Sequence, residues 1–180
     1  SMFYTLSHSN IWNVNARGSN IFDGGAHFYQ TYKTKDDKFI SFGSLEPQFY
    51  SILVDKLDLD EKFNNQMDMS NWNIFKDEIQ KKIALKTRDE WDQLFLNSDV
   101  CYSPVLSIDE THENDHMKKR NNFLTINDVI QPAPAPRFSN TKSSEPKQAP
   151  TIGEDNNEIL LNLGYKDEDI SKLKEENIIN

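Results

Sequence analysis

Glu46 is the acidic side chain whose place in the sequence most favours chemistry. It follows an apolar run that ends at Leu45, and it precedes Pro47, a residue that suits the first turn of a helix. A glutamate at this place can simply interact with the helix dipole, which contributes about 0.3–1 kcal/mol. From these residues alone, the structural role is favoured over a chemical one.

A second arrangement is the string His112-Glu113-x-x-His116, which has the spacing of a zinc-protease signature. On one helix it would place two imidazoles on the same face, with Glu113 as a base. That signature belongs in an apolar, buried helix, whereas the neighbours here are polar and charged and no third ligand is evident. The sequence therefore favours a solvated polar turn and predicts no metal, and a zinc protease is the most distant alternative.

Other reactive side chains also have structural interpretations. Cys101 lies in an apolar run with no histidine nearby, so a core thiol is expected rather than a nucleophile. His8 and His27 are isolated, and a surface position is expected for His8. Asp23 precedes two glycines, and a turn residue that bonds nearby backbone is favoured over a substrate role.

The hydrophobic pattern predicts one small α+β domain over residues 25–106 to position these side chains. Aromatic and β-branched runs at 28–34 and 38–43 predict a hairpin, and 100–106 predicts a further short strand. Three helices are predicted, and their expected first residues are Glu46-Pro47, a cap at Ser70, and Thr87 with a capping box through Glu90. The apolar stripe of the first is expected at Phe49, Leu53 and Leu57, and that of the second at Trp72, Phe75, Ile79 and Ile83.

The flanking segments differ from this domain. Residues 1–24 are expected to be an irregular linker from a large domain that the chain lacks. Residues 107–151 are expected to be a return linker with a short polar helix, a strand at 123–126 and a proline-rich extended arm from 131 onward. Residues 152–180 carry two short helices, of which the first is expected to end at Gly164. Because such helices are marginal alone, they need a surface on which to dock.

Composition excludes some classes of function. The 180 residues carry a net charge of −9, and no dense Lys/Arg run suggests a nucleic-acid partner. A single cysteine fits a reducing compartment, and no apolar run is long enough to span a membrane. An intracellular protein is expected, but mitochondrion, peroxisome and cytoplasm are not distinguishable.

Several motifs occur in an order that matches a known family. They are Arg17-Gly18-x-Asn20-x-x-Asp23-Gly24-Gly25-Ala26, Tyr29, Gly43-x-x-Glu46-Pro47-Gln48-Phe49-Tyr50, Thr87-x-x-Glu90-Trp91, Cys101-x-x-Pro104-Val105-Leu106 and Pro132-x-Pro134-x-Pro136-Arg137-Phe138-Ser139. Together they resemble the C-terminal half of the α-methylacyl-CoA racemase branch of the class III CoA-transferase family. The match covers almost the whole chain.

This resemblance implies an isomerase that interconverts (R)- and (S)-2-methylacyl-CoA by removing and returning the α-proton. The acid and base would be a histidine and an aspartate of the N-terminal half, so the chain alone is expected to be inactive. The family forms an interlocked homodimer in which the small domain of one subunit covers the active site of the other. Glu46 would hydrogen-bond the catalytic histidine of that other subunit, and the terminal helices would dock on a Rossmann-like large domain. No cofactor is implied, because the substrate itself carries coenzyme A.

The resemblance also places residues at the acyl chain. Ile21, Phe22, Tyr29 and Leu45 match positions that line the acyl pocket, and Asp23 is grouped with them as substrate-binding. His27 departs from the proline that usually follows Gly-Gly-Ala in the family.

Two alternatives remain open. One is a CoA-transferase of the same family, which uses an aspartyl nucleophile. The other is a non-catalytic dimerisation or regulatory module. Under every one of these interpretations, the arm and terminal helices lack their partner surface, and their exposed apolar faces predict self-association.

Overall fold

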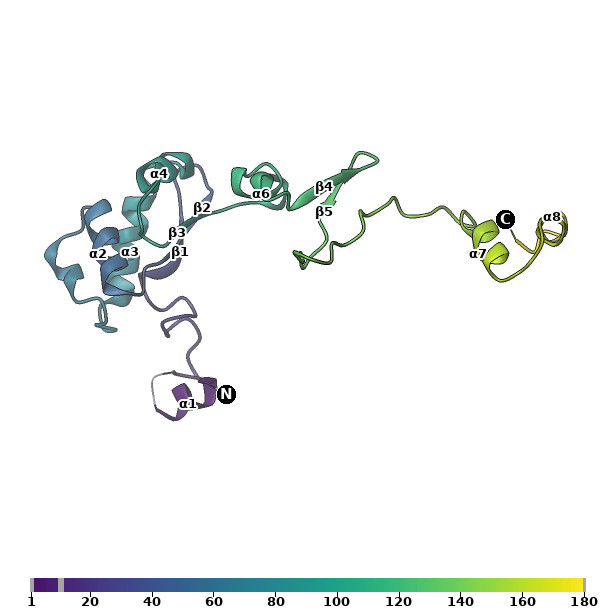
Figure 1. The fold of residues 1–180 in the computed structure, drawn as a ribbon. Coiled ribbons are helices and arrows are strands. Elements are labelled where there is room, and N and C mark those ends of the chain that lie inside the picture. Colours follow the sequence, from purple (N-terminus) through teal and green to yellow (C-terminus); the bar gives the residue numbers. More distant parts are fainter. Residues whose placement is uncertain (1, 10–11, 180) are drawn as a thin grey trace. The chain divides into compact units, whose positions relative to one another are not determined.

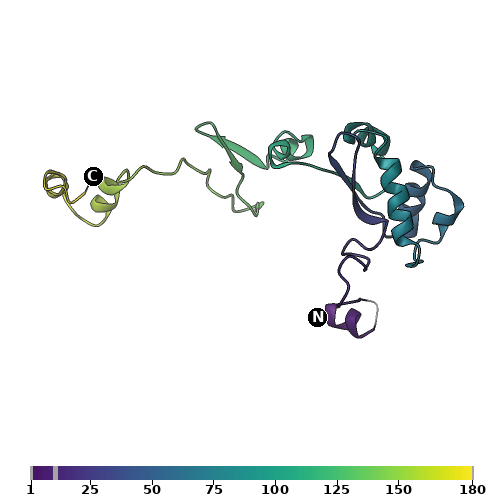
Figure 2. The same ribbon diagram turned by 180° about the vertical axis from the view of Figure 1, so that it is seen from behind.

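The computed structural model describes residues 2–9 and 12–179. They form two compact units, Ser1–Ile108 and Asp109–Asn180, and each unit is considered by itself. Figures 1 and 2 show the elements of both units from opposite sides. The division predicted from the sequence, at residues 24, 106 and 151, stays a prediction.

The first unit contains a three-stranded antiparallel sheet, which confirms the predicted hairpin and third strand. Its strands are β1 (Tyr29–Lys33), β2 (Phe39–Gly43) and β3 (Tyr102–Val105), in that order across the sheet. Tyr29 lies opposite Gly43, and Ser41 lies opposite Ser103. Side chains alternate between the two faces of a strand, so Ile40 and Phe42 lie on the same face of β2, and both are buried.

Helices of the first unit provide the rest of its core. They are α2 (Pro47–Lys56), the 3₁₀ helix η1 (Glu61–Asn64), α3 (Trp72–Ile83) and α4 (Arg88–Phe95). The predicted apolar stripe of α3 is confirmed, because Trp72, Phe75, Ile79 and Ile83 are all buried. On α2 the core-facing residue of the first turn is Tyr50, whereas the sequence pattern favoured Phe49.

The predicted helix starts have different outcomes. Thr87 caps α4, accepting a hydrogen bond from the Glu90 N–H while the Glu90 carboxylate accepts one from the Thr87 N–H, so the capping box is confirmed. Ser70 is not the cap of α3. Its hydroxyl donates to Asp68 Oδ1 at 2.6 Å, which leaves it bound within the preceding turn.

The beginning of the chain also differs from expectation. The segment Met2–His8 forms helix α1, where an irregular lead-in was expected. The Ser9 N–H and the Ser9 hydroxyl both donate to the Thr5 carbonyl, at 3.0 Å and 2.7 Å, and these hydrogen bonds close its last turn. His8 is exposed, as expected, and its Nδ1 lies 2.8 Å from the Tyr4 carbonyl oxygen.

The second unit is built from short elements. They are α5 (Ile108–Thr111), which begins at the boundary, α6 (Asp115–Lys119), β4 (Phe123–Ile126), β5 (Val129–Pro132), α7 (Asn156–Asn162) and α8 (Asp167–Glu175). Strand β5 was not predicted. It pairs with β4 through a turn at Asn127 and Asp128, whose φ angles of 47° and 60° are those of a tight hairpin.

The terminal helices match their predictions. The chain leaves α7 through Gly164, whose φ of +90° suits glycine, and the Tyr165 N–H donates to the Leu160 carbonyl at 3.0 Å. Within residues 2–9 and 12–179, no helix is both long and apolar enough to cross a membrane.

Candidate functional site

The histidine pair of the second unit does not lie on one helix. Helix α5 ends at Thr111 and α6 begins at Asp115, and between them Asn114 caps α6 by accepting from the His116 N–H at 3.1 Å. His112 therefore lies in the turn between the two helices, and His116 lies in α6. The polar-turn interpretation is confirmed, and the described chain contains no cluster of three acidic, histidine or cysteine side chains able to hold a metal ion.

Cys101 is not a core thiol. It is exposed, it lies outside β3, and its φ of +54° places it in a turn before that strand. Partial desolvation of the thiol, together with the negative charges of Asp99 and Glu46, raises the pKa of Cys101. A raised thiol pKa lowers the thiolate fraction, which disfavours a nucleophilic role.

A hollow of about 500 Å³ lies on the outer face of the sheet. Phe22, Asp23 and Tyr29 line one side of it, so the structure brings these three predicted substrate residues together. The rings of Phe22 and Tyr29 meet edge to face at 5.1 Å. The other side is formed by residues that include Ser41, Gly43, Cys101 and Ser103.

Asn20 fixes the turn that carries Phe22. Its amide nitrogen donates to Asp23 Oδ2 at 2.6 Å, and its backbone N–H donates to Asp23 Oδ1 at 2.7 Å. The Asn20 side chain also accepts from the Asn13 N–H at 2.7 Å, although the asparagine itself is 1% exposed. This asparagine and Asp23 thus hold the loop before β1 in one shape, which presents Phe22 to solvent.

Burial opposes ionisation of Asp23, but hydrogen bonds from the side chain and backbone of Asn20 and from the N–H groups of Gly18 and Gly25 lower its pKa overall.

Close packing requires glycine at position 25. A Cβ there would lie 2.4 Å from the Ser19 carbonyl carbon and 2.5 Å from Asn20 O. The Asp-Gly-Gly motif is therefore explained by the turn itself, and a substrate role of Asp23 stays a prediction.

Ile21 and Leu45 do not line this hollow. Both are half-buried and pack against the hydrophobic core of the first unit. Their assignment to an acyl pocket also stays a prediction.

Glu46 occupies the N-cap position of α2, with φ −73° and ψ 142°. Its carbonyl accepts from the Phe49 and Tyr50 N–H groups, both at 3.0 Å. Its side chain makes no capping bond and is exposed, so the helix does not use the carboxylate. The carboxylate lies near enough to Cys101, at the edge of the hollow, to affect that thiol.

His27 is a core residue. It is 0% exposed, its Nε2 lies 2.7 Å from the Tyr50 hydroxyl, and that hydroxyl donates to the Phe63 carbonyl at 2.8 Å. Because the single Tyr50 proton is used by Phe63, His27 donates through Nε2–H, and its Nδ1 has no partner within the described residues. Burial, aided by the positive charge of Lys76, lowers the pKa of His27 to about 4. The ring is thus neutral and structural.

Several lining residues of the hollow were not predicted from the sequence. Thr31, Ser41 and Ser103 alternate with more buried residues along their strands, and that alternation marks the outer face. The alternation shows which face of the sheet is exposed. Only the folded structure shows that Phe22 lines the hollow on that face.

Comparisons with known proteins identify the family. The chain belongs to CoA-transferase family III, whose sequence profile matches residues 2–156. Among its relatives, the α-methylacyl-CoA racemase of Homo sapiens is 38% identical over 182 aligned residues, which cover 99% of this chain and 47% of the relative. The cinnamoyl-CoA:phenyllactate CoA-transferase of Clostridium sporogenes is 26% identical, covering 83% of this chain and 39% of the relative.

A solved structure, that of a CaiB/BaiF family protein from Brucella suis, has the same fold as most of this chain. It aligns with a TM-score of 0.70 at 16% identity, covering 89% of this chain and 43% of that one. The chain therefore spans less than half of the length of each of these relatives.

Proposed function

We propose that this chain is the C-terminal portion of an α-methylacyl-CoA racemase, which interconverts (R)- and (S)-2-methylacyl-CoA. The observation that carries the proposal is the likeness to the human racemase, at 38% identity over nearly the whole chain against 26% for the clostridial transferase. The reaction needs no cofactor other than the coenzyme A that the substrate carries. A histidine and an aspartate from an N-terminal half would move the α-proton.

In this proposal Glu46 acts on the histidine of a second subunit in an interlocked homodimer. Its carboxylate is exposed and its own helix does not bond it, which leaves it available for an outside partner. A carboxylate that accepts from one imidazole nitrogen fixes the tautomer and favours the protonated ring. Such a bond is worth about 1.5–3 kcal/mol, or roughly 10- to 150-fold in rate if it is fully expressed in the transition state.

The hollow beside Glu46 would receive the acyl chain. The exposed Phe22 and Tyr29 rings offer an apolar wall, while the small residues of β2 and β3 leave room opposite. A smooth aromatic wall lets a branched chain shift position as the α-carbon inverts. In the proposal Ile21 and Leu45 support this wall from behind.

The test joins this chain to the N-terminal half of the human racemase and compares it with the chain alone. Exchange of the α-proton of 2-methylacyl-CoA in heavy water reports racemase chemistry, and thioester formation with a free-acid acceptor reports transfer. We expect exchange without transfer in the joined protein and neither reaction in the chain alone. Transfer without exchange would support the CoA-transferase alternative, and turnover by the chain alone would refute the claim that it lacks the acid and base.

Glu46→Gln sharpens this test. It keeps the size of the side chain but removes its charge, so kcat of the joined protein should fall by roughly 10- to 100-fold. Glu61→Gln is the matched control, because Glu61 is an exposed first-turn glutamate of η1 in the same unit. Equal rates for the two variants would contradict the role of Glu46.

A further inference from the structure

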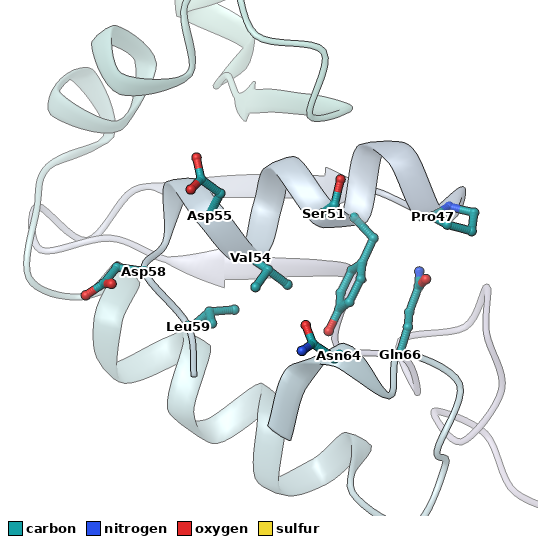
Figure 3. Close-up of a pocket in the computed structure, with 9 residues that line it drawn as sticks. Pro47, Ser51, Val54, Asp55, Asp58, Leu59, Asn64 and Gln66 are labelled. Carbon is teal, nitrogen blue, oxygen red and sulfur yellow. The ribbon is translucent and has the colours of Figure 1, made fainter. Parts of the chain in front are cut away.

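Gln66 is a buried polar residue in an otherwise exposed loop. The loop joins η1 to α3, and Gln66 is 7% exposed although its neighbours Asn65 and Met67 are exposed. Figure 3 shows its side chain extending toward the N-terminal end of α2, where Pro47 lies. Burying an amide is unfavourable unless its hydrogen bonds are made, so its partners are informative.

Those partners are the two residues immediately before Glu46. The Gln66 amide nitrogen donates to the Ser44 carbonyl at 3.0 Å and to the Leu45 carbonyl at 2.9 Å. Both amide protons are therefore used on one short stretch of backbone, between the end of β2 and the start of α2.

Gln66 is itself anchored in the core. Its main-chain carbonyl accepts a hydrogen bond from the indole N–H of Trp72 at 2.9 Å. Trp72 is 3% exposed and packs edge to face on Phe28, with the ring centroids 5.8 Å apart. The main chain of Gln66 is thus fixed to the core, while its side chain bonds the backbone before Glu46. Because its own position is fixed, Gln66 can fix the position of that backbone.

The same stretch of backbone is held from other directions as well. The Ser44 N–H donates to the Phe28 carbonyl at 3.0 Å, and the Ser44 hydroxyl donates to the Val100 carbonyl at 2.5 Å. On the other side, Pro47 restricts the residue before it to extended backbone, which is the conformation that Glu46 has. The Gln66 side chain bonds the carbonyl of Leu45, the residue directly before Glu46.

These contacts matter because nothing in the described chain holds the Glu46 side chain directly. Its direction is set by the backbone that enters α2, and the Leu45–Glu46 peptide is the last link of that backbone. We propose that Gln66 is a positioning residue, which aims the Glu46 carboxylate by clamping the Ser44 and Leu45 carbonyls. This inference rests on the proposed function, in which Glu46 contacts a histidine of the other subunit.

The physical basis is the steep dependence of a hydrogen bond on geometry. Without Gln66, the Ser44 and Leu45 carbonyls lose their side-chain donor, and the Leu45–Glu46 peptide is held less firmly even though the other Ser44 bonds remain. A displacement of about 1 Å at a catalytic contact can cost on the order of 100-fold in rate. Substrate affinity should change little, because Gln66 does not line the hollow that holds Phe22 and Tyr29.

The experiment uses Gln66→Met in the joined protein, with Gln80→Met as the matched control. Gln80 on α3 also makes two backbone hydrogen bonds, accepting from the Lys33 N–H at 3.0 Å and donating to the Lys33 carbonyl at 2.8 Å, but it does so on β1. Gln66→Met should lower Tm more than Gln80→Met, because Gln66 is buried and Gln80 is half-buried, so kcat is measured below the Tm of both variants. We expect Gln66→Met to lower kcat by about tenfold with KM within about twofold, and Gln80→Met to leave kcat within about twofold.

A double-mutant cycle separates this inference from the proposed function. Adding Gln66→Met to Glu46→Gln should lower kcat by less than about twofold further, because the carboxylate that Gln66 aims is already gone. Full additivity, or equal losses for the Gln66 and Gln80 variants, would overturn the positioning role while leaving the racemase proposal intact. A silent Glu46→Gln would overturn both the positioning role of Gln66 and the proposed role of Glu46.

A second variant guards against a folding artefact. Gln66→Glu has nearly the same shape, but its carboxyl can donate one hydrogen bond when it is protonated and none when it is ionised, so it cannot bond both the Ser44 and Leu45 carbonyls. It should therefore lower kcat at neutral pH, as Gln66→Met does. Wild-type kcat in a folded Gln66→Glu protein would contradict the inference.

Discussion

The two units of this protein treat their apolar side chains differently. In the first unit, helices α2, α3 and α4 and the sheet share a core that extends from Ala26 to Val100. Among the described residues of the second unit, Ile170 is the single buried hydrophobic residue, at 4% exposure. Ile152 and Leu163 of the second unit are 91% and 70% exposed.

Yet helices of both units have the same amphipathic sequence pattern. Helix α7 carries an apolar face, as α3 does, but its apolar residues Ile159 and Leu161 remain largely exposed. An amphipathic pattern shows that a helix has a face to bury, but not whether the partner surface lies within the same chain. The difference supports the proposal that the terminal helices dock on a large domain.

The largest contrast should come from truncating one apolar side chain in each unit. Phe28→Ala removes a fully buried ring, so the free energy of unfolding should fall by about 3–5 kcal/mol. Leu163→Ala removes an exposed side chain and should change it by less than about 0.5 kcal/mol. Urea unfolding followed by far-ultraviolet circular dichroism at low protein concentration measures both, and equal losses would contradict the comparison.

Acid should destabilise the first unit through His27. Its pKa is about 4 when folded and about 6.5 when unfolded, so the unfolded chain binds more protons between these values. The stabilising effect of the neutral ring is complete above pH 6.5 and is lost as the pH falls toward 4, by about 3 kcal/mol. His27→Gln should remove this part of the pH dependence, whereas the same change at the exposed His8 should not. A slope that persists in His27→Gln would exclude His27 as its source.

Self-association should depend on the second unit. Replacing Ile152 and Leu163 with serine should raise the dissociation constant about tenfold, because less apolar area is then available for burial. Met67 and Met69, 51% and 58% exposed in the first unit, provide the control pair. Light scattering across a concentration series measures this, and a monomer at high concentration would contradict the prediction.

The smallest contrast concerns helix caps. Thr87→Ala breaks the capping box of α4 and should cost about 1 kcal/mol. Asp155 is the N-cap of α7 but makes no capping bond, so Asp155→Ala should be nearly neutral. Thermal unfolding followed by circular dichroism compares the two variants, and a larger loss for Asp155→Ala would reverse the expectation.

Local signals were predicted well from the sequence. The capping box at Thr87, the glycine that ends α7 and the hairpin of β1 and β2 all depend on residues close together in the chain. Errors arose where several local signals competed or where a distant contact decided. Ser70 bonds Asp68 instead of capping α3, and Cys101 lies in an exposed turn instead of the core.

The candidate site shows the same division. The motif residues Asn20, Asp23 and Gly25 are close in sequence, and their turn follows from hydrogen bonds and close packing within a few residues. Gln66 lies about twenty residues after the carbonyls that it clamps, and no local pattern identifies it as their partner.

The sequence by itself determined the family, the α+β class and the order of the elements, because periodicity, caps and turns are short-range properties of the chain. Only the tertiary structure decided that Phe22 meets Tyr29 over the sheet, that His27 is enclosed in the core, and that the Glu46 carboxylate is left exposed at its helix N-terminus. Burial and hydrogen-bond partnership depend on which distant segments pack together, and that is a property of the whole fold.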